Sequence, residues 1–348
     1  MRGIGAALIC VLASWLLAAC SVAPVPVSQP PAAVVQHPAP GGPPGELGVY
    51  TASEGASLAY VSYRQPGATT ALVYLHGIES HAGWFAIAAD ALRDQGYDVY
   101  CLDRRGSGLN REDRGFVSGY VDDYATLLSD IDAFVAPLRE RYQNVFLVGL
   151  SWGGKLALSY GLAHPHAVDG LVLITPGLRA RVDVSLMQKL KIALLSPLNP
   201  GARVALPIRP EMFTTTPVYL DYIRNDPLRL SSATVRFLWQ SHRLDGYVDR
   251  NISDNRLPIQ LFLAGGDTII DNEGVVELLQ RGSAGGLAVQ RYEDQTHSVQ
   301  MDAARRLSDD MTAWLRAQET ALRAQMPVGV RLPLRPENGG APCHWLAN

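Results

Sequence analysis

The fold is decided by residues 145–154, which read Val-Phe-Leu-Val-Gly-Leu-Ser-Trp-Gly-Gly. The four apolar residues predict a buried strand, and the residues from Gly153 to His164 predict a helix. Between them stands Gly-x-Ser-x-Gly, whose glycines are needed because side chains would clash in so tight a turn. The pattern predicts that Ser151 is presented at the helix N-terminus as a nucleophile. The alternative is a glycine-rich turn that carries a solvated serine.

Strands and helices alternate on both sides of this turn. Short apolar runs of the kind buried in a parallel sheet are expected at 71–75, 97–102, 145–148, 170–174, 259–264 and 288–292. Helix-length amphipathic segments are expected at 84–95, 121–141, 153–164, 273–280 and 301–323. A hairpin, 47–52 with 57–64, comes first. The alternation predicts an α/β fold, a mostly parallel sheet with helices on both faces.

One long segment interrupts the alternation, from about residue 178 to 255. It holds several prolines, no obvious strand and apolar helical pieces at 184–195 and 219–223. An insertion at this point would lie over the carboxyl edge of the sheet, so we expect a helical cap. Its apolar side chains either line an acyl-chain site or simply pack a helix; they are Leu186, Met187, Leu190, Leu194 and Leu195.

A serine nucleophile needs a base, and the base needs an orienting acid. After a strand–serine–helix turn the chain order is serine, acid, histidine. The strand 259–264 runs into Gly265-Gly266-Asp267, which places a carboxylate at the carboxyl edge of the sheet. Asp267 is therefore the predicted acid. Asp271, four residues later, is the alternative and is expected to cap the next helix.

The predicted base is His297, in the loop that follows strand 288–292. The other histidines after Ser151 fit less well: two flank Pro165 at a helix end, one lies in the cap with no acid suitably placed behind it, and one lies in the tail. They are His164, His166, His242 and His344.

Acyl transfer also needs hydrogen-bond donors for the oxyanion. The backbone N–H groups of Trp152, directly after the nucleophile, and of Ile78, in the loop after strand 71–75, are the expected pair. His76 in that loop is expected to have a packing or hydrogen-bonding role. The glycine-containing loop 103–108 lacks the Lys-Ser/Thr of a phosphate-binding loop and is expected to be a structural turn.

Together these residues resemble the α/β-hydrolase fold and, within it, the monoacylglycerol lipase and lysophospholipase-like group. The matching motifs are His76-Gly77-Ile78 with Ser80-His81, Asp103-x-x-Gly106-x-Gly108, residues 149–154, Asp226-Pro227-Leu228, Gly265-Gly266-Asp267 with Asp271, and His297-Ser298. The resemblance implies a serine hydrolase of ester bonds with a cap over an acyl-chain tunnel. It implies neither a metal nor a cofactor.

Two departures keep alternatives open. The group usually has His and Met beside the nucleophile, where this chain has Leu150 and Trp152. A Trp after the serine also resembles proline iminopeptidases, but those carry Gly-Gly-Pro-Gly where residues 77–80 read Gly-Ile-Glu-Ser. A third possibility is a binding lipoprotein without turnover, and the intact order of Ser151, Asp267 and His297 argues against it.

The N-terminus reads as a lipoprotein signal peptide over residues 1–19. A basic start and an uncharged run from Ile4 to Leu17 lead to Leu17-Ala18-Ala19-Cys20. This tetrapeptide resembles the bacterial lipobox, which implies cleavage before Cys20 and a lipid anchor on its sulfur. We therefore expect attachment to the bacterial cell envelope, at the periplasmic face of the outer membrane if the cell has two membranes.

The expected domain organisation follows from composition. A Pro/Ala-rich tether (20–45) precedes the hydrolase domain (46–326), and a Pro/Gly-rich tail (327–348) ends the chain. The 348 residues carry a net charge of −3 with no basic cluster, which argues against nucleic-acid binding. Four cysteines without a C-x-x-C pair argue against a structural zinc site. An ester or lipid substrate and a membrane are the expected partners.

Overall fold

The central feature of the computed structural model is an eight-stranded sheet with the strand order β1-β2-β4-β3-β5-β6-β9-β10. The structure describes residues 36–182 and 186–325. The strands are β1 (Glu46–Thr51), β2 (Ser57–Tyr63), β3 (Thr70–Leu75), β4 (Asp98–Leu102), β5 (Asn144–Leu150), β6 (Gly170–Ile174), β9 (Ile259–Ala264) and β10 (Leu287–Tyr292). From β4 to β10 neighbouring strands are parallel, whereas β1 and β2 form the predicted antiparallel hairpin. The predicted α/β architecture, a mostly parallel sheet opened by a hairpin, is present.

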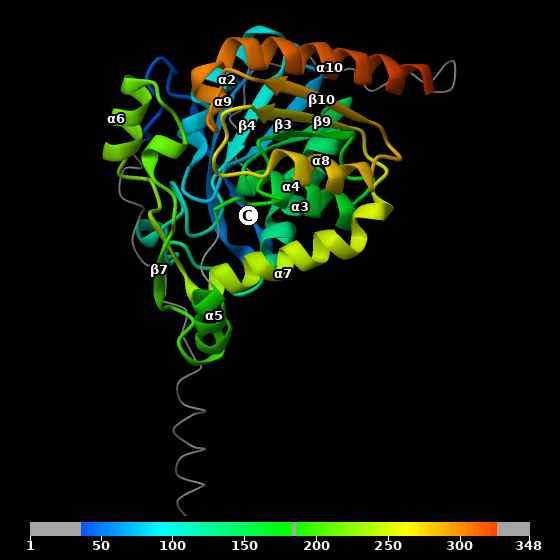
Figure 1. The fold of residues 1–348 in the computed structure, drawn as a ribbon. Coiled ribbons are helices and arrows are strands. Elements are labelled where there is room, and N and C mark those ends of the chain that lie inside the picture. Colours follow the sequence, from blue (N-terminus) through cyan, green and yellow to red (C-terminus); the bar gives the residue numbers. More distant parts are fainter. Residues whose placement is uncertain (1–35, 183–185, 326–348) are drawn as a thin grey trace, which may run out of the picture. The chain divides into compact units, whose positions relative to one another are not determined.

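Helices cover both faces of the sheet (Figure 1). One face carries α2 (Ala86–Asp94) and α10 (Ala304–Gln325), while the other carries α3 (Tyr124–Arg141), α4 (Trp152–Ala163) and α8 (Asn272–Gln280). The expected helix 301–323 is two helices, because the chain leaves helical geometry at Ala303 between α9 (Val299–Asp302) and α10.

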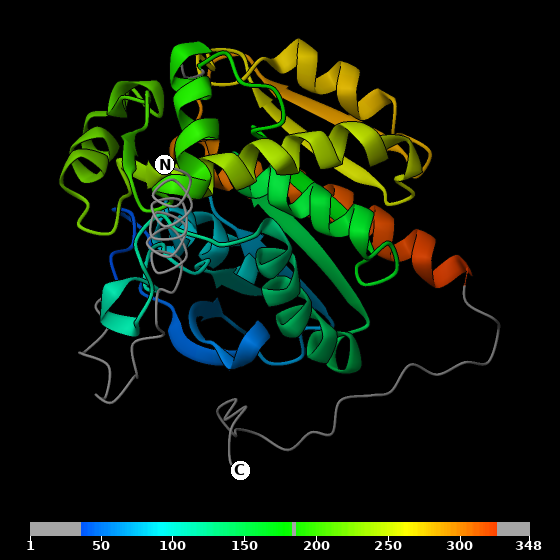
Figure 2. The same cartoon turned by 90° about the horizontal axis from the view of Figure 1, so that it is seen from below.

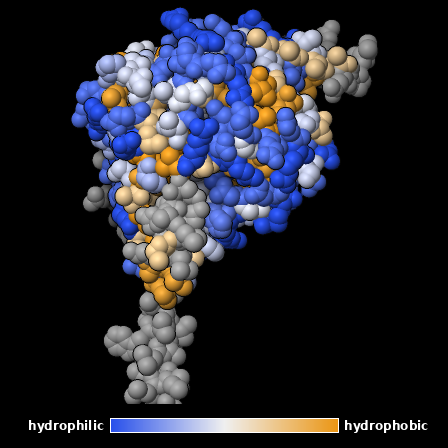
Figure 3. Space-filling model, in the orientation of Figure 1, coloured by the Kyte–Doolittle hydropathy of each residue, from blue (hydrophilic) through white to orange (hydrophobic). Residues whose placement is uncertain are grey.

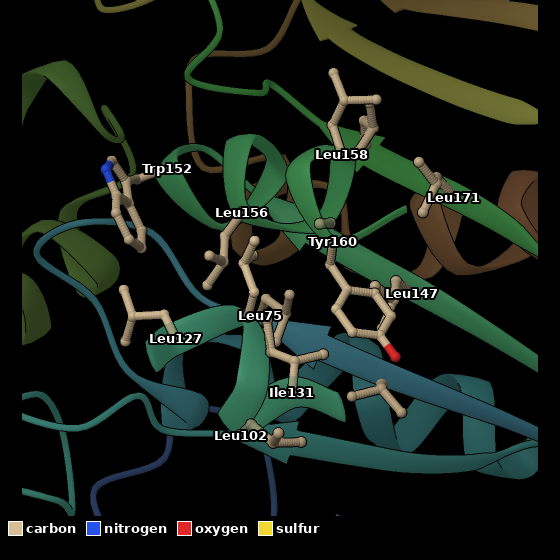
Figure 4. Close-up of a cluster of buried hydrophobic side chains, with 14 of the residues drawn as sticks. Leu75, Leu102, Leu127, Ile131, Leu147, Trp152, Leu156, Leu158, Tyr160 and Leu171 are labelled. Atoms are coloured by element: carbon tan, nitrogen blue, oxygen red, sulfur yellow. The ribbon is translucent and has the colours of Figure 1, made fainter. Parts of the chain in front are cut away.

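The core follows from the composition of the central strands. Every residue of β3, β5, β6 and β9 is buried, as expected for parallel strands covered on both faces. On the α3/α4 face, Leu75, Leu147 and Leu156 belong to one apolar cluster that reaches Trp152 at the start of α4 (Figure 4). The turn that carries Ser151 is thus supported by packed side chains.

The cap extends from about Leu178 to Asn255 and contains more than the sequence predicts. Its helices are α5 (Leu186–Leu198), α6 (Pro217–Asn225) and α7 (Val235–Asn251). The expectation of no strand is wrong, since β7 (Arg203–Ala205) and β8 (Ser232–Thr234) pair antiparallel. Three-residue strands are too short to show a clear alternation. Helix α7 lies along α4 (Figure 2).

Two further features concern the expected membrane association. Among residues 36–182 and 186–325, no helix combines the length and apolar character needed to cross a bilayer. The end of the expected tether packs on the domain: Ala39 is 1% exposed, its N–H donates to Gly83 O, and the Tyr222 hydroxyl donates to His37 O. Cys20 and residues 20–35, the signal peptide and the tail with Cys343 lie outside the described residues.

Candidate active site

Ser151 occupies the predicted turn between β5 and α4. Its backbone has φ 51° and ψ −122°, a conformation that costs free energy in a residue with a Cβ and persists only when its surroundings hold it. Those restraints are visible: Ser151 N–H donates to Ile174 O at 2.9 Å, and Ser151 O accepts from Gly154 N and Gly177 N. The serine is therefore held at the N-terminus of α4, where only 8% of it is exposed.

The motif glycines are required by close backbone approach. A Cβ on Gly149 would lie 2.5 Å from Gly153 O, and a Cβ on Gly153 would lie 2.0 Å from Leu75 O. Real Cβ contacts are essentially never below 3.0 Å. Gly149 thus lets the nucleophile turn close on the start of α4, and Gly153 lets it pack against the end of β3.

Asp267 and His297, the predicted acid and base, follow β9 and β10 and contact each other. His297 Nδ1 lies 2.8 Å from Asp267 Oδ2, while Asp267 Oδ1 accepts the N–H groups of Ile269 and Ile270. Burial acts to raise the pKa of Asp267, but the charge and hydrogen bond of His297 and these two N–H groups outweigh it, so the pKa is lowered. The ionised carboxylate can therefore hold the Nδ1–H tautomer of His297.

The end of β6 brings the serine and the histidine together. Ile174 O accepts the N–H of Ser151, and the next residue, Thr175, donates its hydroxyl to His297 O at 3.2 Å. His297 Nε2 is buried and makes no hydrogen bond to any described residue. This nitrogen is the atom that would take the serine proton. Hydrogen bonds between a nucleophile and its base often form fully only when substrate binds.

Ile78 and Trp152 supply two free backbone donors beside the nucleophile. Neither N–H donates a hydrogen bond to any residue that the structure describes. Parallel pairing of β3 with β5 puts the loop after β3 against the nucleophile turn, and a Cβ on Gly77 would lie 3.3 Å from Ser151 Cβ. Two unpaired N–H groups beside the nucleophile turn are the kind of donors that the predicted oxyanion hole needs.

Asp226 links the loop after β3 to the cap. Its Oδ2 accepts from His81 Nε2 at 2.9 Å and from Trp84 Nε1 at 2.6 Å, and its Oδ1 accepts the N–H of Leu228. Burial acts to raise the pKa of Asp226, but these donors hold it below its usual value. The carboxylate thus joins the cap to the segment that begins at His81.

Two contacts at the site have no clear signal in the sequence. Glu79, next to Ile78, is 1% exposed and pairs with Arg229 of the cap at 2.7 Å, and burial raises the pKa of Glu79 to about 7 despite this partner. Phe213 of the cap lies over the His297 ring at a centroid distance of 5.7 Å. Both depend on how the cap folds back, which spacing along the chain does not encode.

The alternatives weighed from the sequence lie elsewhere. Asp271 is at the N-cap position of α8, as expected, but its side chain makes no capping hydrogen bond; its backbone O accepts from Val275 N instead. His164 ends α4 and stacks on Tyr160, and His242 is exposed on α7 beside Trp239. His344 is outside the described residues.

One cluster has the composition of a metal site: His37, His81 and Asp226, whose ligand atoms lie within 4.8 Å of one another. His81 Nδ1 accepts the N–H of Gly83 at 3.0 Å, so its Nε2 carries the proton that it donates to Asp226. A protonated Nε2 is not a metal ligand, and this hydrogen bonding fits the cluster as a contact between the cap and residue 37.

Two cavities are lined by residues other than Ser151, Asp267 and His297, and the smaller one includes His76 and Arg104 in its lining. One of about 150 Å³ lies between α3 and the strands β1, β2 and β4, lined by Tyr50, Tyr60, Tyr100 and Phe134 among others. Three apolar side chains of α5 are instead exposed: Met187, Leu194 and Leu198 are 74%, 60% and 70% exposed. They form an apolar surface on that helix (Figure 3).

Comparison with known proteins places this geometry in a family. Residues 67–304 match the family described as serine aminopeptidase, S33. A putative monoglyceride lipase from Schizosaccharomyces pombe is 22% identical over 257 residues, which cover 70% of this chain and 66% of that protein. The chain thus spans slightly less than two thirds of this relative.

The match with this chain spans a larger share of two other proteins. Phospholipase YtpA from Bacillus subtilis is 22% identical over 66% of this chain and 87% of its own. A soluble variant of monoglyceride lipase from Saccharomyces cerevisiae has a similar structure, with a TM-score of 0.71 and 20% identity over 81% of this chain and 99% of that one.

The relatives and structural neighbours support the predicted class of serine ester hydrolase. The family match covers well over half of the sequence, including the segments that carry Ser151, Asp267 and His297. The chain belongs to the serine aminopeptidase S33 family of α/β-hydrolases.

Proposed function

We propose that the protein hydrolyses carboxylic esters, of the monoacylglycerol or lysophospholipid type, through an acyl-enzyme on Ser151. The observation that carries the proposal is the constrained Ser151 at the start of α4, beside the Asp267–His297 pair and the free N–H groups of Ile78 and Trp152. Relatives that are lipases by name support the same class of substrate.

The proposed mechanism has two halves. Ser151 Oγ attacks the ester carbonyl while His297 Nε2 takes its proton, and the tetrahedral oxyanion is held by the N–H groups of Ile78 and Trp152. His297 then protonates the leaving alcohol as the C–O bond breaks. Water attacks the acyl-enzyme in the same way, which releases the carboxylic acid and regenerates Ser151. Asp267 stays ionised and stabilises the imidazolium.

A lipid substrate is supported by the surface of the cap. Met187, Leu194 and Leu198 recur at positions that share one face of α5, and all three are exposed. An exposed apolar stripe of this kind favours contact with a lipid surface or with a hydrophobic substrate. A soluble ester would make no use of it.

Aminopeptidase activity is the second candidate, because the family is described by that activity. A peptidase of this kind needs a carboxylate to bind the protonated amino group of its substrate. Glu79 is the acid closest in sequence to the oxyanion donors, and it is buried against Arg229. This arrangement favours the ester substrate.

We also propose that the chain is anchored to the bacterial envelope through a lipid on Cys20, facing the periplasm from the outer membrane where there are two membranes. The support is the sequence Leu17-Ala18-Ala19-Cys20 and the proline-rich segment behind it. Cys20→Ala should move the protein from the membrane fraction to the soluble fraction and abolish incorporation of a labelled fatty acid. A membrane-bound Cys20→Ala protein would contradict the anchor.

The substrate class is tested with protein that begins near Ser21. Its hydrolysis of p-nitrophenyl esters from acetate to palmitate, of a monoacylglycerol, of a lysophospholipid and of a prolyl amide is compared with that of Ser151→Ala. We expect turnover of the glyceride or the lysolipid, lost in the variant. Turnover of the prolyl amide alone would establish the aminopeptidase, and no turnover together with no fluorophosphonate labelling would leave a binding protein.

A further inference from the structure

Arg104 is a buried cation directly behind the oxyanion donors. It follows β4, whose end pairs with the end of β3 at Leu75–Leu102, so the loops after these strands are neighbours. Only 9% of the residue is exposed, and its guanidinium makes no ion pair with any residue in the described part of the chain. Burial lowers the pKa of Arg104 to about 9, opposed by Asp103, so it keeps its charge at neutral pH.

The guanidinium binds the backbone of the oxyanion loop with both terminal nitrogens. Nη1 donates to Gly77 O at 2.9 Å, and Nη2 donates to Ile78 O at 2.6 Å. Two parallel N–H groups on one planar fork fix an acceptor pair more rigidly than a single rotatable amine can. The two carbonyls are thereby held on one side of the loop.

His76 completes the grip on the same carbonyl. Its Nε2 accepts the backbone N–H of Arg104 at 3.2 Å, so Nδ1 carries the proton and donates to Gly77 O at 2.8 Å. Burial and the charge of Arg104 hold the pKa of His76 well below its usual value, which keeps the ring neutral in this tautomer. Gly77 O thus accepts from two donors.

The geometry of the peptide unit carries the consequence. In a planar trans peptide the C=O of one residue and the N–H of the next point in opposite directions. A Gly77 carbonyl that faces Arg104 therefore directs the N–H of Ile78 away from it. That N–H makes no hydrogen bond to a described residue, and Gly77 lies against Ser151.

Arg104 also contacts the second donor residue. Its guanidinium carbon lies 5.0 Å from the centre of the Trp152 ring and 5.3 Å from that of Phe237, within cation–π range of both. One buried side chain therefore touches both segments whose N–H groups would hold the oxyanion. Its positive charge on the carbonyl side also polarises the Gly77–Ile78 peptide, which strengthens the N–H as a donor.

We propose that Arg104 is a positioning residue of the oxyanion hole, which aims and polarises the Ile78 N–H and fixes the Trp152 segment beside it. The proposal rests on the proposed hydrolase function and adds a residue that does not touch the substrate. Loss of Arg104 should reduce the stabilisation of the transition state and leave ground-state binding of the ester almost unchanged.

Arg105 provides a matched control, because it is the next residue and also a largely buried arginine. It pairs with Asp130 at 2.6 Å and bonds Ser53, on the side of α3 and the β1–β2 hairpin. Arg105→Met removes the same charge from the same loop without touching the carbonyls of Gly77 or Ile78. It should lower the melting temperature and leave kcat close to that of the wild type.

The test compares Arg104→Met, Arg104→Lys and Arg105→Met by kcat and KM on a p-nitrophenyl ester, each corrected for the fraction of sites that a fluorophosphonate titrates. For Arg104→Met we expect kcat to fall about 10²–10³-fold, the effect of losing one oxyanion donor, with KM within about threefold. Arg104→Lys should retain more of the wild-type kcat than Arg104→Met, because lysine keeps the positive charge but lacks the planar pair of N–H donors.

The rate of Ser151 labelling by the fluorophosphonate separates this proposal from the proposed function, since labelling also forms a charged oxygen at the same donors but needs no ester specificity. If the wild type is labelled and cleaves no ester, the substrate assignment fails while slower labelling of Arg104→Met still supports the positioning role. The positioning role of Arg104 would be overturned if Arg104→Met and the wild type had equal kcat per titrated site and equal labelling rates. An equal loss in Arg105→Met, or a wild type that is not labelled, would also overturn it.

Discussion

Gly153→Ala tests the close approach of the nucleophile turn to the end of β3. The new Cβ would lie 2.0 Å from Leu75 O and 2.6 Å from His76 O, against the 3.0 Å below which real Cβ contacts essentially never fall. Both obstacles are backbone atoms, and Leu75 is paired in the sheet on both sides. The two segments must therefore separate by about 1 Å, the difference between these distances.

Two effects follow from that separation. Overpacking of a buried contact costs about 1–3 kcal/mol. In a domain of this size each kcal/mol lowers the melting temperature by about 2–4 °C. A displacement of about 1 Å between Ser151 and the Ile78 donor should lower kcat about 10²-fold.

Gly246→Ala is the matched control, since it adds the same methyl group to a helical glycine. Its nearest neighbour is the flexible end of Arg250, at 3.1 Å. Replacing a helix-interior glycine by alanine should stabilise the protein by about 1 kcal/mol and leave kcat unchanged. Thermal unfolding and kcat per fluorophosphonate-titrated site measure both variants. The reasoning would be refuted if Gly153→Ala kept the kcat and the melting temperature of the wild type.

Three further predictions follow from the same geometry. Asp267→Asn should lower kcat on the order of 10⁴-fold, because an amide no longer selects the Nδ1–H tautomer of His297; steady-state kinetics on a short ester would contradict this if kcat fell less than tenfold. Burial raises the pKa of Glu79 to about 7 in the folded protein, whereas its value in the unfolded chain is near 4.5. The protonation of Glu79 therefore contributes fully to the free energy of unfolding below pH 4.5, and this contribution is lost as the pH rises through 7. Between pH 5 and pH 8 the wild type should therefore lose on the order of 2–3 kcal/mol of unfolding free energy relative to Glu79→Gln. Urea titrations in which the two proteins differ by the same unfolding free energy at both pH values would rule this out. Met187→Glu with Leu194→Glu should reduce hydrolysis of monoacylglycerol in vesicles while hydrolysis of p-nitrophenyl acetate stays constant, and an equal loss on both substrates would argue against a lipid-facing α5.

The sequence carries enough information to place the predicted nucleophile, acid and base at one edge of the sheet. Each lies at or shortly after the carboxyl end of a parallel strand, β5, β9 or β10, and these ends meet at one edge of the sheet. The apolar run, the glycines and the order of Ser151, Asp267 and His297 therefore predict the arrangement that the structure shows.

The cap and the support of the oxyanion loop lie beyond such patterns. Strands β7 and β8 have three residues each, too few for a periodic signal, and the packing of α7 on α4 depends on how the cap folds back. Arg104 reads as one residue of a structural turn; its hydrogen bonds to Gly77 and Ile78 depend on the pairing of β3 with β4. Contacts between loops of neighbouring strands depend on sheet order, which local sequence does not specify.

The central claim is that Ser151 becomes acylated by an ester and is freed by water. Rapid acid quenching during turnover of a p-nitrophenyl ester, followed by mass spectrometry of the peptides, tests it most directly. The account predicts the acyl mass on Ser151 of the wild type. In His297→Ala the acyl group should form on Ser151 at a greatly reduced rate, and Ser151→Ala should carry no acyl mass at this position. Acylation of another residue, or turnover that persists in Ser151→Ala, would contradict the account.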